Sequence, residues 1–239
     1  MDPDKFLERL SHIGISHLVV VPCSFAKDLI NSCINNSDII DYLPCASEAI
    51  ACSVASGLVI SGKKPLVILQ SSGLTNMGSC LTSLTKPYNI FFPIISSWRT
   101  YKEGDSEIQH KHLALNLPKL IDAYGFKYYE LGDSVSSAID MINDSFKKHQ
   151  ILIINKNSFS SCELQKNHKL NLSEFPKRSE YLSVLSDFKS NDKKIIKFIG
   201  TTGNTAREMY HIMNKTKNFY MAGNMGGALS VGFGSALAG

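Results

Sequence analysis

The chain contains 239 residues, of which 44% are hydrophobic and 19% are charged. This composition is typical of a globular protein and excludes disordered, collagen-like and coiled-coil classes. The formal net charge of +4 is small and dispersed, and no basic stripe alternates with aromatic residues, so we expect no nucleic-acid partner. The charge is compatible with a small anionic ligand.

No apolar run approaches the roughly 20 residues that a membrane-spanning helix needs, and the N-terminal stretch lacks the apolar core of a signal peptide. The six cysteines are spread along the chain without a C-x-x-C pair, which favours free, buried thiols in a reducing compartment. We therefore expect a cytoplasmic protein with no membrane partner.

Segments rich in Val, Ile and Phe alternate with segments of helical period over residues 4–155. The predicted strands cover residues 17–22, 38–43, 65–70, 89–96, 126–131 and 150–155. The predicted helices cover residues 4–13, 24–35, 47–60, 74–84, 113–124 and 134–148. This alternation predicts an α/β fold class with a doubly wound parallel sheet of about six strands.

The pattern weakens after residue 155 and restarts near residue 193. In between, Ser, Asn, Lys and Pro accumulate, which indicates a linker with one helix over residues 180–188. The last part predicts a strand at 193–200, a loop and helix at 201–213, a short strand at 218–223 and a Gly-rich turn that enters a helix. Two strands and two helices cannot form a self-sufficient sheet, so we expect the start of a second α/β domain that continues beyond Gly239.

Glu48 is the carboxylate that stands out, because "PCASEAIACSVASG" surrounds it with small and apolar residues and no basic residue. At about 3.6 residues per turn, it shares a helical stripe with Ala51, Cys52 and Ala55, and a second apolar stripe suggests packing on more than one side. One interpretation is a first-turn glutamate that the helix dipole favours. The other is a carboxyl group kept from water and placed to share a proton with a ligand.

Two further stretches follow strand ends, where open α/β sheets bind ligands. Ser24 in "VVVPCSF" is a helix cap, a carboxylate-binding corner, or both. "LQSSGLTNMGS" runs from a strand end through Gly73 into a helix and is rich in side-chain donors. It is either an ordinary turn capped by Ser72 or Thr75, or a polar wall around a ligand.

The loop "SSWRTYKEGDSEIQHKHL" gathers Arg99, Lys102, His110 and further polar side chains after another strand end. Such a loop is either solvated surface or a lid that collects positive charge around a dianionic group. Its spacing does not indicate zinc. The glycines of "MAGNMGGALSVG" do not follow the G-x-G-x-x-G spacing of a dinucleotide site, but a diphosphate-facing loop of backbone amides stays open.

Taken in order, these stretches resemble the thiamine diphosphate-dependent decarboxylases, in the branch of the phosphonopyruvate and sulfopyruvate decarboxylases. The motifs that carry the resemblance are "VPCSF", "SEAIACSVASGLVISGKKPLV", "QSSGLTNMGSCLTSL", "WRTYKEGDSEIQH" and "TTGNTAREMYHIMNKTKNFYMAGNMGGALSVGFGSALA", which together cover most of the chain. The resemblance implies a pyrimidine-binding domain over residues 1–165, a linker over 166–192 and the N-terminal part of a diphosphate-binding domain over 193–239. It also implies a homo-oligomer, a dimer or dimer of dimers, with active sites between subunits.

The resemblance assigns a role to each candidate residue. Glu48 corresponds to the catalytic glutamate that hydrogen-bonds N1′ of the aminopyrimidine of thiamine diphosphate and so activates the cofactor for attack. The residues placed toward the cofactor are Gly73, Thr202, Gly203, Gly223 and Met225. The residues placed toward a small anionic 2-oxo acid are Ser24, Gln70, Thr75, Arg99, Lys102 and His110.

The reaction that the resemblance implies is non-oxidative decarboxylation of 3-phosphonopyruvate to phosphonoacetaldehyde and carbon dioxide, in phosphonate biosynthesis. Sulfopyruvate or another 2-oxo acid is the alternative substrate, and a cofactor-binding or assembly module without turnover is the alternative outside enzymes. The Gly-Asp-Gly segment whose residues bind Mg²⁺ in this family would lie beyond Gly239, so we expect no metal ligands within this chain and no activity from it alone. Ile108 also stands where the family usually has Pro.

Overall fold

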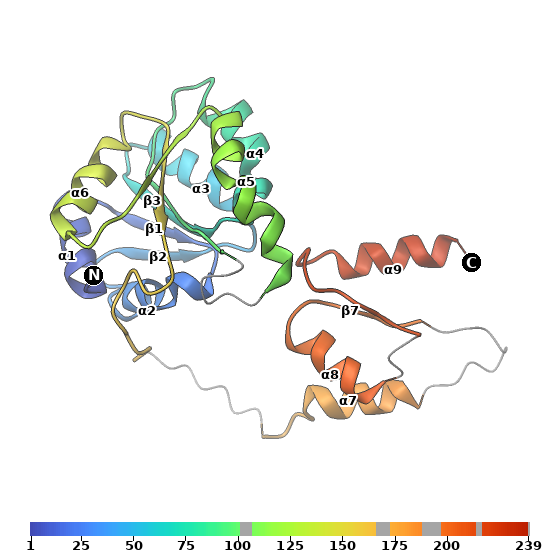
Figure 1. The fold of residues 1–239 in the computed structure, drawn as a ribbon. Helices are drawn as coiled ribbons and strands as arrows, with labels where there is room; N and C mark the ends of the chain where they lie inside the picture. Colours follow the sequence, from blue (N-terminus) through green and yellow to red (C-terminus); the bar gives the residue numbers. More distant parts are fainter. Residues whose placement is uncertain (101–106, 166–172, 188–196, 214–216, 239) are drawn as a thin grey trace. The chain divides into compact units, whose positions relative to one another are not determined.

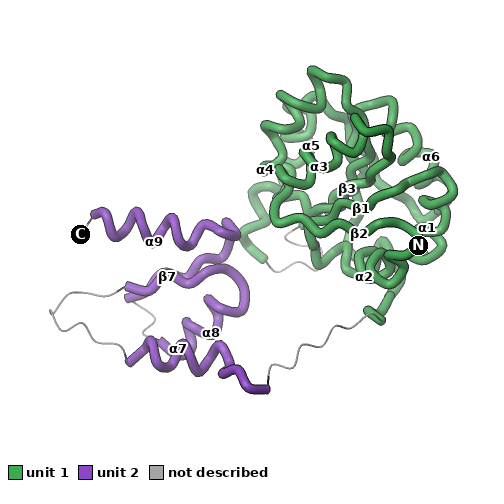
Figure 2. Tube along the Cα trace, turned by 180° about the vertical axis from the view of Figure 1, so that it is seen from behind, with its two compact units in different colours: residues 1–167 green, residues 168–239 purple. Residues whose placement is uncertain are grey.

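The computed structural model describes residues 1–100, 107–165, 173–187, 197–213 and 217–238. The chain divides into two compact units, Met1–Asn167 and His168–Gly239 (Figure 2). Among the described residues, unit 1 carries a six-stranded sheet and unit 2 a two-stranded one.

All strands of the sheet in unit 1 are parallel. In chain order they are β1 (His17–Val20), β2 (Asp41–Pro44), β3 (Pro65–Gln70), β4 (Ile94–Ser97), β5 (Lys127–Glu130) and β6 (Gln150–Ile154). They lie side by side in the order β2-β1-β3-β4-β6-β5. Because β1 lies between β2 and β3, the winding reverses between β1 and β3, and sheets of this kind bind ligands beyond the carboxyl ends of the strands at such a point.

Helices cover both faces of this sheet, as Figure 1 shows. They are α1 (Pro3–His12), α2 (Lys27–Asn35), α3 (Glu48–Ile60), α4 (Gly73–Cys80), α5 (Lys111–Ala123) and α6 (Val135–Asp144). Leu18 and Val20 of β1 pack in one apolar cluster with α1, α2 and α6, whereas Val19 packs in the other with α3, α4 and α5. Successive strand residues thus face opposite helical layers, and the predicted doubly wound α/β fold is confirmed.

Two strands are shorter than the sequence pattern predicted. The strand predicted over residues 38–43 begins only at Asp41, because the residues before it form a turn after α2. The strand predicted over residues 89–96 begins only at Ile94, directly after Pro93. Proline has no N–H to donate to a neighbouring strand, which explains the late start.

The helix predicted over residues 74–84 is regular only as far as Cys80 and continues as a π-helical turn, η2 (Leu81–Thr85). The hydroxyls of Thr82 and Thr85 donate to the carbonyls four residues earlier, at 2.8 and 2.9 Å. Such side-chain bonds compete with the main-chain ladder and bend helices. The end of this helix therefore departs from the regular period that the sequence indicated.

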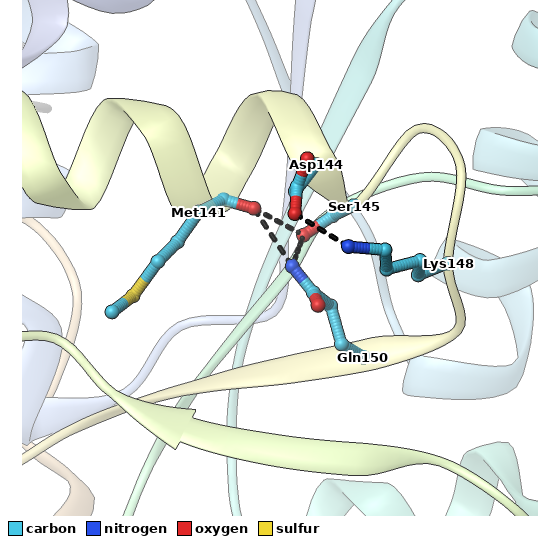
Figure 3. A network of polar contacts seen from close by, with 5 residues as sticks. All are labelled: Met141, Asp144, Ser145, Lys148 and Gln150. Atoms are coloured by element: carbon cyan, nitrogen blue, oxygen red, sulfur yellow. Dashed lines mark hydrogen bonds and ion pairs between the residues drawn. The ribbon is translucent and has the colours of Figure 1, made fainter.

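Gln150 connects the start of β6 to the end of α6 (Figure 3). Its buried amide donates to the carbonyl of Met141 and to Oγ of Ser145, both at 2.8 Å, and Ser145 itself donates to Met141 at 2.9 Å. Asp144 and Lys148 form an ion pair at 2.7 Å beside this network, with both side chains exposed. The Met141 carbonyl also accepts from the main-chain N–H of Ser145 at 3.1 Å, so Gln150 adds a further donor at the end of α6.

Unit 2 holds two short parallel strands and three described helices. They are α7 (Arg178–Ser186), β7 (Ile199–Gly200), α8 (Asn204–Ile212), β8 (Phe219–Tyr220) and α9 (Ala228–Leu237). Leu182 of α7 is buried with Met209 and Met213 at α8, and Arg178 binds Glu208 through two bonds of 2.8 and 2.6 Å. The stretch predicted as a linker, residues 166–192, thus contains a helix that packs on α8.

The described cysteines are all free thiols. Cys23, Cys33 and Cys52 are buried, and the other three are half-buried. No helix among the described residues has the length and apolar character that crossing a membrane would require.

Candidate active site

Glu48 begins α3, directly after β2. The helix is capped by Ser47, whose Oγ accepts from the N–H of Ile50 at 3.4 Å. Only 7% of Glu48 is exposed, and the rest of its predicted stripe is buried with it, namely Ala51, Cys52 and Ala55. Ile50 of the second stripe is half exposed, so the expected packing on more than one side is wrong for this residue within the described chain.

The thiol nearest to Glu48 along the buried stripe is neutral. Burial raises the pKa of Cys52 to about 12, with the neighbouring Cys80 contributing to the rise. A thiol with such a pKa is neither a nucleophile nor a competing negative charge at neutral pH. Cys52 therefore places no negative charge on the buried stripe beside Glu48.

The carboxyl group of Glu48 is held from the neighbouring helix α4. Asn76 Nδ2 donates to Glu48 Oε2 at 2.8 Å. The carboxyl also lies against Gly73 of the same helix, where a Cβ atom would come within 2.4 Å of Oε1 and 2.6 Å of Cδ. Only glycine leaves room for this approach, so α4 supplies both a donor and a cradle for the carboxyl.

Ser24 lies within a 3₁₀ turn, η1 (Ser24–Ala26), so the prediction that it caps a helix is wrong: Cys23 and Ala26 occupy the cap positions of η1 and α2. The 3₁₀ turn begins at Ser24 itself, and Ser24 Oγ lies toward the residues that follow β4. There it accepts from Arg99 Nη1 at 2.9 Å.

Arg99 follows β4 and is only 9% exposed. Its guanidinium carbon lies 4.5 Å from the ring centre of Phe25, and its main-chain N–H donates to Oγ of Ser71 at 3.3 Å. Contact with an aromatic face and with Ser24 fixes this cation in place. A planar, permanently charged group suits the recognition of a phosphonate, sulfonate or carboxylate.

A cavity of about 300 Å³ opens beside Ser24. Its lining comes from the end of β1 and from α2, and consists of Pro22, Cys23, Ser24, Lys27, Ile30 and Asn31. Cys23 Sγ lies 2.9 Å from Oγ of Ser97 at the end of β4. With Lys27 in its wall, the cavity offers a second positive charge near the bond between Ser24 and Arg99.

The other predicted substrate residues lie at or beyond the same strand ends. Gln70 is the last residue of β3 and pairs in register with Ser97. Thr75 is exposed on α4 and its hydroxyl donates to Ser72 O at 2.6 Å. His110 ends the 3₁₀ turn η3 (Ile108–His110) and is 9% exposed. Lys102 lies outside the described residues.

The parallel strands bring these side chains to one edge of the sheet. Ser24 follows β1, Glu48 follows β2, Gly73 follows β3 and Arg99 follows β4, and these four strands are neighbours. Carboxyl ends of parallel strands share an edge, so Ser24, Glu48, Gly73 and Arg99 lie at the same edge. The contacts join them in two sets, Glu48 with Gly73 and Ser24 with Arg99.

The remaining predicted residues belong to unit 2. Thr202 and Gly203 precede α8, and Gly203 has a φ of 79°, in the region that favours glycine. Gly223 and Met225 lie in the turn before α9, and Met225 is 80% exposed. Both segments lead into helix N-termini, which bind anions through free N–H groups.

No group of three or more His, Cys, Asp or Glu side chains among the described residues is arranged to hold a metal ion. The expectation that Mg²⁺ ligands lie outside these 239 residues stays a prediction.

Asn76, Lys27 and Ser71 were not foreseen from the sequence. Asn76 stands in the donor-rich stretch after β3, three residues beyond Gly73, and this spacing places both on one side of a helix. This spacing is the sequence feature from which the role of Asn76 could have been predicted. Lys27 and Ser71 show their roles only through contacts between separate strand ends.

Residues 4–113 match the family model "Thiamine pyrophosphate enzyme, N-terminal TPP binding domain". A sulfopyruvate decarboxylase from Methanosarcina acetivorans is 25% identical over 98% of this chain. Phosphonopyruvate decarboxylases from Streptomyces viridochromogenes and Streptomyces hygroscopicus are each 27% identical, over 95% and 97% of this chain. The chain spans 65%, 61% and 61% of the lengths of these relatives.

A solved structure of the thiamine diphosphate-dependent 4-hydroxybenzoylformate decarboxylase of Rhodococcus jostii RHA1 superposes with a TM-score of 0.52. It is 14% identical and covers 84% of this chain and 39% of its own, so it supports the fold alone. The family resemblance drawn from the sequence motifs is confirmed by the family model and the curated relatives. Residues 4–113 belong to the family of thiamine pyrophosphate enzymes, as their N-terminal TPP-binding domain.

Proposed function

We propose that the protein is a thiamine diphosphate- and Mg²⁺-dependent 2-oxo acid decarboxylase that converts 3-phosphonopyruvate to phosphonoacetaldehyde and carbon dioxide. The observation that carries the proposal is the buried carboxyl of Glu48, held by Asn76 and cradled by Gly73 inside the domain that matches the family. A carboxyl kept from bulk water and fixed in position suits the sharing of a proton with a ring nitrogen.

The residues present fit the cofactor in chemical kind. Gly73 packs so closely against the Glu48 carboxyl that a Cβ would not fit between them, and this contact helps to hold the carboxyl in place. When bound, thiamine diphosphate supplies the nucleophilic carbon and the electron sink of the decarboxylation. Glu48 would hold a proton against N1′ of the aminopyrimidine, Gly223 and Met225 would contact the cofactor ring system, and Thr202 and Gly203 would face the diphosphate.

On the substrate side, the fixed guanidinium of Arg99 would bind the distal anion. Ser24 accepts from Arg99 at 2.9 Å and so orients it, and the stacking on Phe25 limits its rotation. Lys27 would add a second charge from the cavity wall, which suits a dianionic group better than a monoanion. Gln70, Thr75 and His110 are placed toward the 2-oxo acid, together with Lys102.

Sulfopyruvate is the second candidate substrate, because the sulfopyruvate decarboxylase of Methanosarcina acetivorans is about as similar to this chain as the phosphonopyruvate enzymes are. Two positive groups near Ser24 favour the phosphonate, which carries more negative charge. We propose a homo-oligomer in which the pyrimidine-binding part, residues 1–165, and the diphosphate-binding part, from residue 193 onward, of different subunits form each active site.

The test is carbon dioxide release by the complete reading frame that contains these residues, with thiamine diphosphate, Mg²⁺ and phosphonopyruvate, sulfopyruvate or pyruvate in turn. We expect phosphonopyruvate to be preferred. Glu48→Gln should lower the rate roughly a hundredfold or more, the usual range for general acid–base groups, while Glu8→Gln on the exposed face of α1 should not.

Two outcomes contradict the proposal. An unchanged rate in Glu48→Gln would show that the acid–base assignment is wrong. Cofactor binding without release of carbon dioxide from any of the three acids would favour a binding or assembly module instead.

A further inference from the structure

We propose that Asn76 is a positioning residue for Glu48: by donating to Oε2 it reserves Oε1, the oxygen beside Gly73, for the transferable proton. The inference rests on the proposed function, since it specifies which oxygen of the acid–base group exchanges a proton with the cofactor. It assigns a role to a residue that the family motifs in the sequence did not single out.

Helix α4 presents two features to the carboxyl from one side. Gly73 and Asn76 are three residues apart, so their positions face the same neighbour across the contact between α3 and α4. Asn76 Nδ2 lies 2.8 Å from Oε2, and a Cβ on Gly73 would lie 2.4 Å from Oε1. The two oxygens of Glu48 are therefore not equivalent: Oε2 accepts from the Asn76 amide, and Oε1 packs so closely against Gly73 that a Cβ would not fit between them.

The location of the proton follows from the donor and acceptor properties of an amide. A side-chain NH₂ group can only donate, so the oxygen that it approaches must offer a lone pair. A proton on Oε2 would compete for that direction, whereas a proton on Oε1 would not. Only 7% of Glu48 is exposed, so water contributes little to which of its oxygens carries the proton.

The neighbouring contacts hold the Glu48 carboxyl beside Asn76. The start of α3 is fixed by the bond from the N–H of Ile50 to Ser47. Moving the carboxyl away from Asn76 would cost a hydrogen bond to a charged group, which is stronger than one between neutral partners. Asn76 is itself exposed, so a substitution there leaves the packed core intact.

The first experiment is a double-mutant cycle on the unfolding midpoint of the 239-residue chain. Asn76→Asp replaces the donor by a second carboxylate of the same shape and should lower the midpoint. Combining it with Glu48→Gln exchanges donor and acceptor and should restore much of the loss. Asn143→Asp, an exposed change on α6, should have little effect in either background. Equal losses from Asn76→Asp with and without Glu48→Gln would overturn the contact on which the inference depends.

The second experiment separates positioning from a purely structural role. In the complete reading frame with cofactor and Mg²⁺, the near-ultraviolet circular dichroism of the bound cofactor is followed against pH. Asn76→Ala removes the donor to Oε2 of Glu48, so the midpoint of the cofactor signal should move if Asn76 positions the carboxyl. Asn143→Asp should leave it in place.

The outcomes distinguish this inference from the proposed function. A coupling in the cycle combined with an unmoved midpoint in Asn76→Ala would mean that Asn76 only stabilises the fold, and would overturn the inference while the enzyme assignment stands. If the parent protein neither binds the cofactor nor releases carbon dioxide, the proposed function fails, and with it the role of Asn76 in proton transfer.

Discussion

The side chains of Gln150 and Glu48 are both buried polar groups in unit 1, but their partners come from different distances along the chain. Gln150 donates to Met141 and Ser145, nine and five residues away, and closes the corner between α6 and β6. Glu48 accepts from Asn76, 28 residues away on another helix. The contacts of Gln150 fix the path of the main chain between α6 and β6, whereas the contact of Asn76 holds the Glu48 carboxyl in one orientation. This difference predicts that stability and activity can be lost separately.

After Glu48→Gln itself, the largest effect on activity is expected from Gly73→Ala. The new Cβ would overlap the Glu48 carboxyl, with Cγ, Cδ and Oε1 all within 2.6 Å, and so displace it. A displacement of about 1 Å in a catalytic group can cost roughly a hundredfold in rate. Carbon dioxide release by the complete protein measures the loss, and urea unfolding should show that the variant still folds, because Ala is favoured over Gly in a helix.

Gly57→Ala is the matched control, because Gly57 lies within α3 and a Cβ there would meet no atom within 4 Å among the described residues. It should raise the free energy of unfolding by about 0.5–1 kcal/mol and leave activity unchanged. A Gly73→Ala protein with the parent rate would show that the cradle is not needed.

The next effect concerns stability alone. Gln150→Leu keeps the buried volume but removes the amide that binds the end of α6 (Figure 3). The expected loss in the free energy of unfolding is about 1–2 kcal/mol, because the Met141 carbonyl keeps its bond from Ser145. Urea unfolding measures this loss. The rate per folded molecule should not change, and a lower rate would mean that the corner is coupled to the site.

Much of the fold could be predicted because its causes are local. Alternating apolar segments identified all six strands of unit 1, and the parallel arrangement follows from the helices between them. The errors have local causes too: Pro93 delays β4, and Thr82 and Thr85 disturb the end of α4. Residue patterns give the period of an element more reliably than its ends.

The candidate site could be predicted only in part, because its contacts join separate elements. The small residues around Glu48 indicated a buried carboxyl, and it is buried. That Asn76 would hold it, or that Ser24 would bind Arg99 instead of capping a helix, depends on the packing of α4 and on the order of the strands. Neither is visible in a single stretch of sequence.

A smaller effect is expected from pH at the start of β6. His149 contacts Phe91 and Phe126, with ring centres 4.5 and 4.9 Å apart, and burial lowers the pKa of His149, with the charge of Lys86 as a further cause. The unfolded chain therefore binds this proton more readily than the folded one does. The stability that comes from keeping His149 neutral is present in full above the ordinary pKa of 6.5 and is lost as the pH falls below it.

Urea unfolding at pH 8 and at pH 5.5 tests this expectation. The parent should lose more stability between the two conditions than His149→Phe, which keeps an aromatic ring but cannot titrate. An identical loss in both proteins would assign the pH dependence to other groups.

The smallest effect is expected from Lys148→Met, which removes the ion pair with Asp144 two residues before Gln150. Both side chains are exposed, by 63% and 54%, although their bond of 2.7 Å is as short as those of the buried amide. Solvent screening and the entropy of two mobile side chains cancel most of the attraction of an exposed pair. The unfolding midpoint should therefore stay near that of the parent in low and high salt. If Lys148→Met lowered the free energy of unfolding as much as Gln150→Leu does, the exposed ion pair would stabilise the corner between α6 and β6 as much as the buried amide. Burial would then not explain the contribution of Gln150.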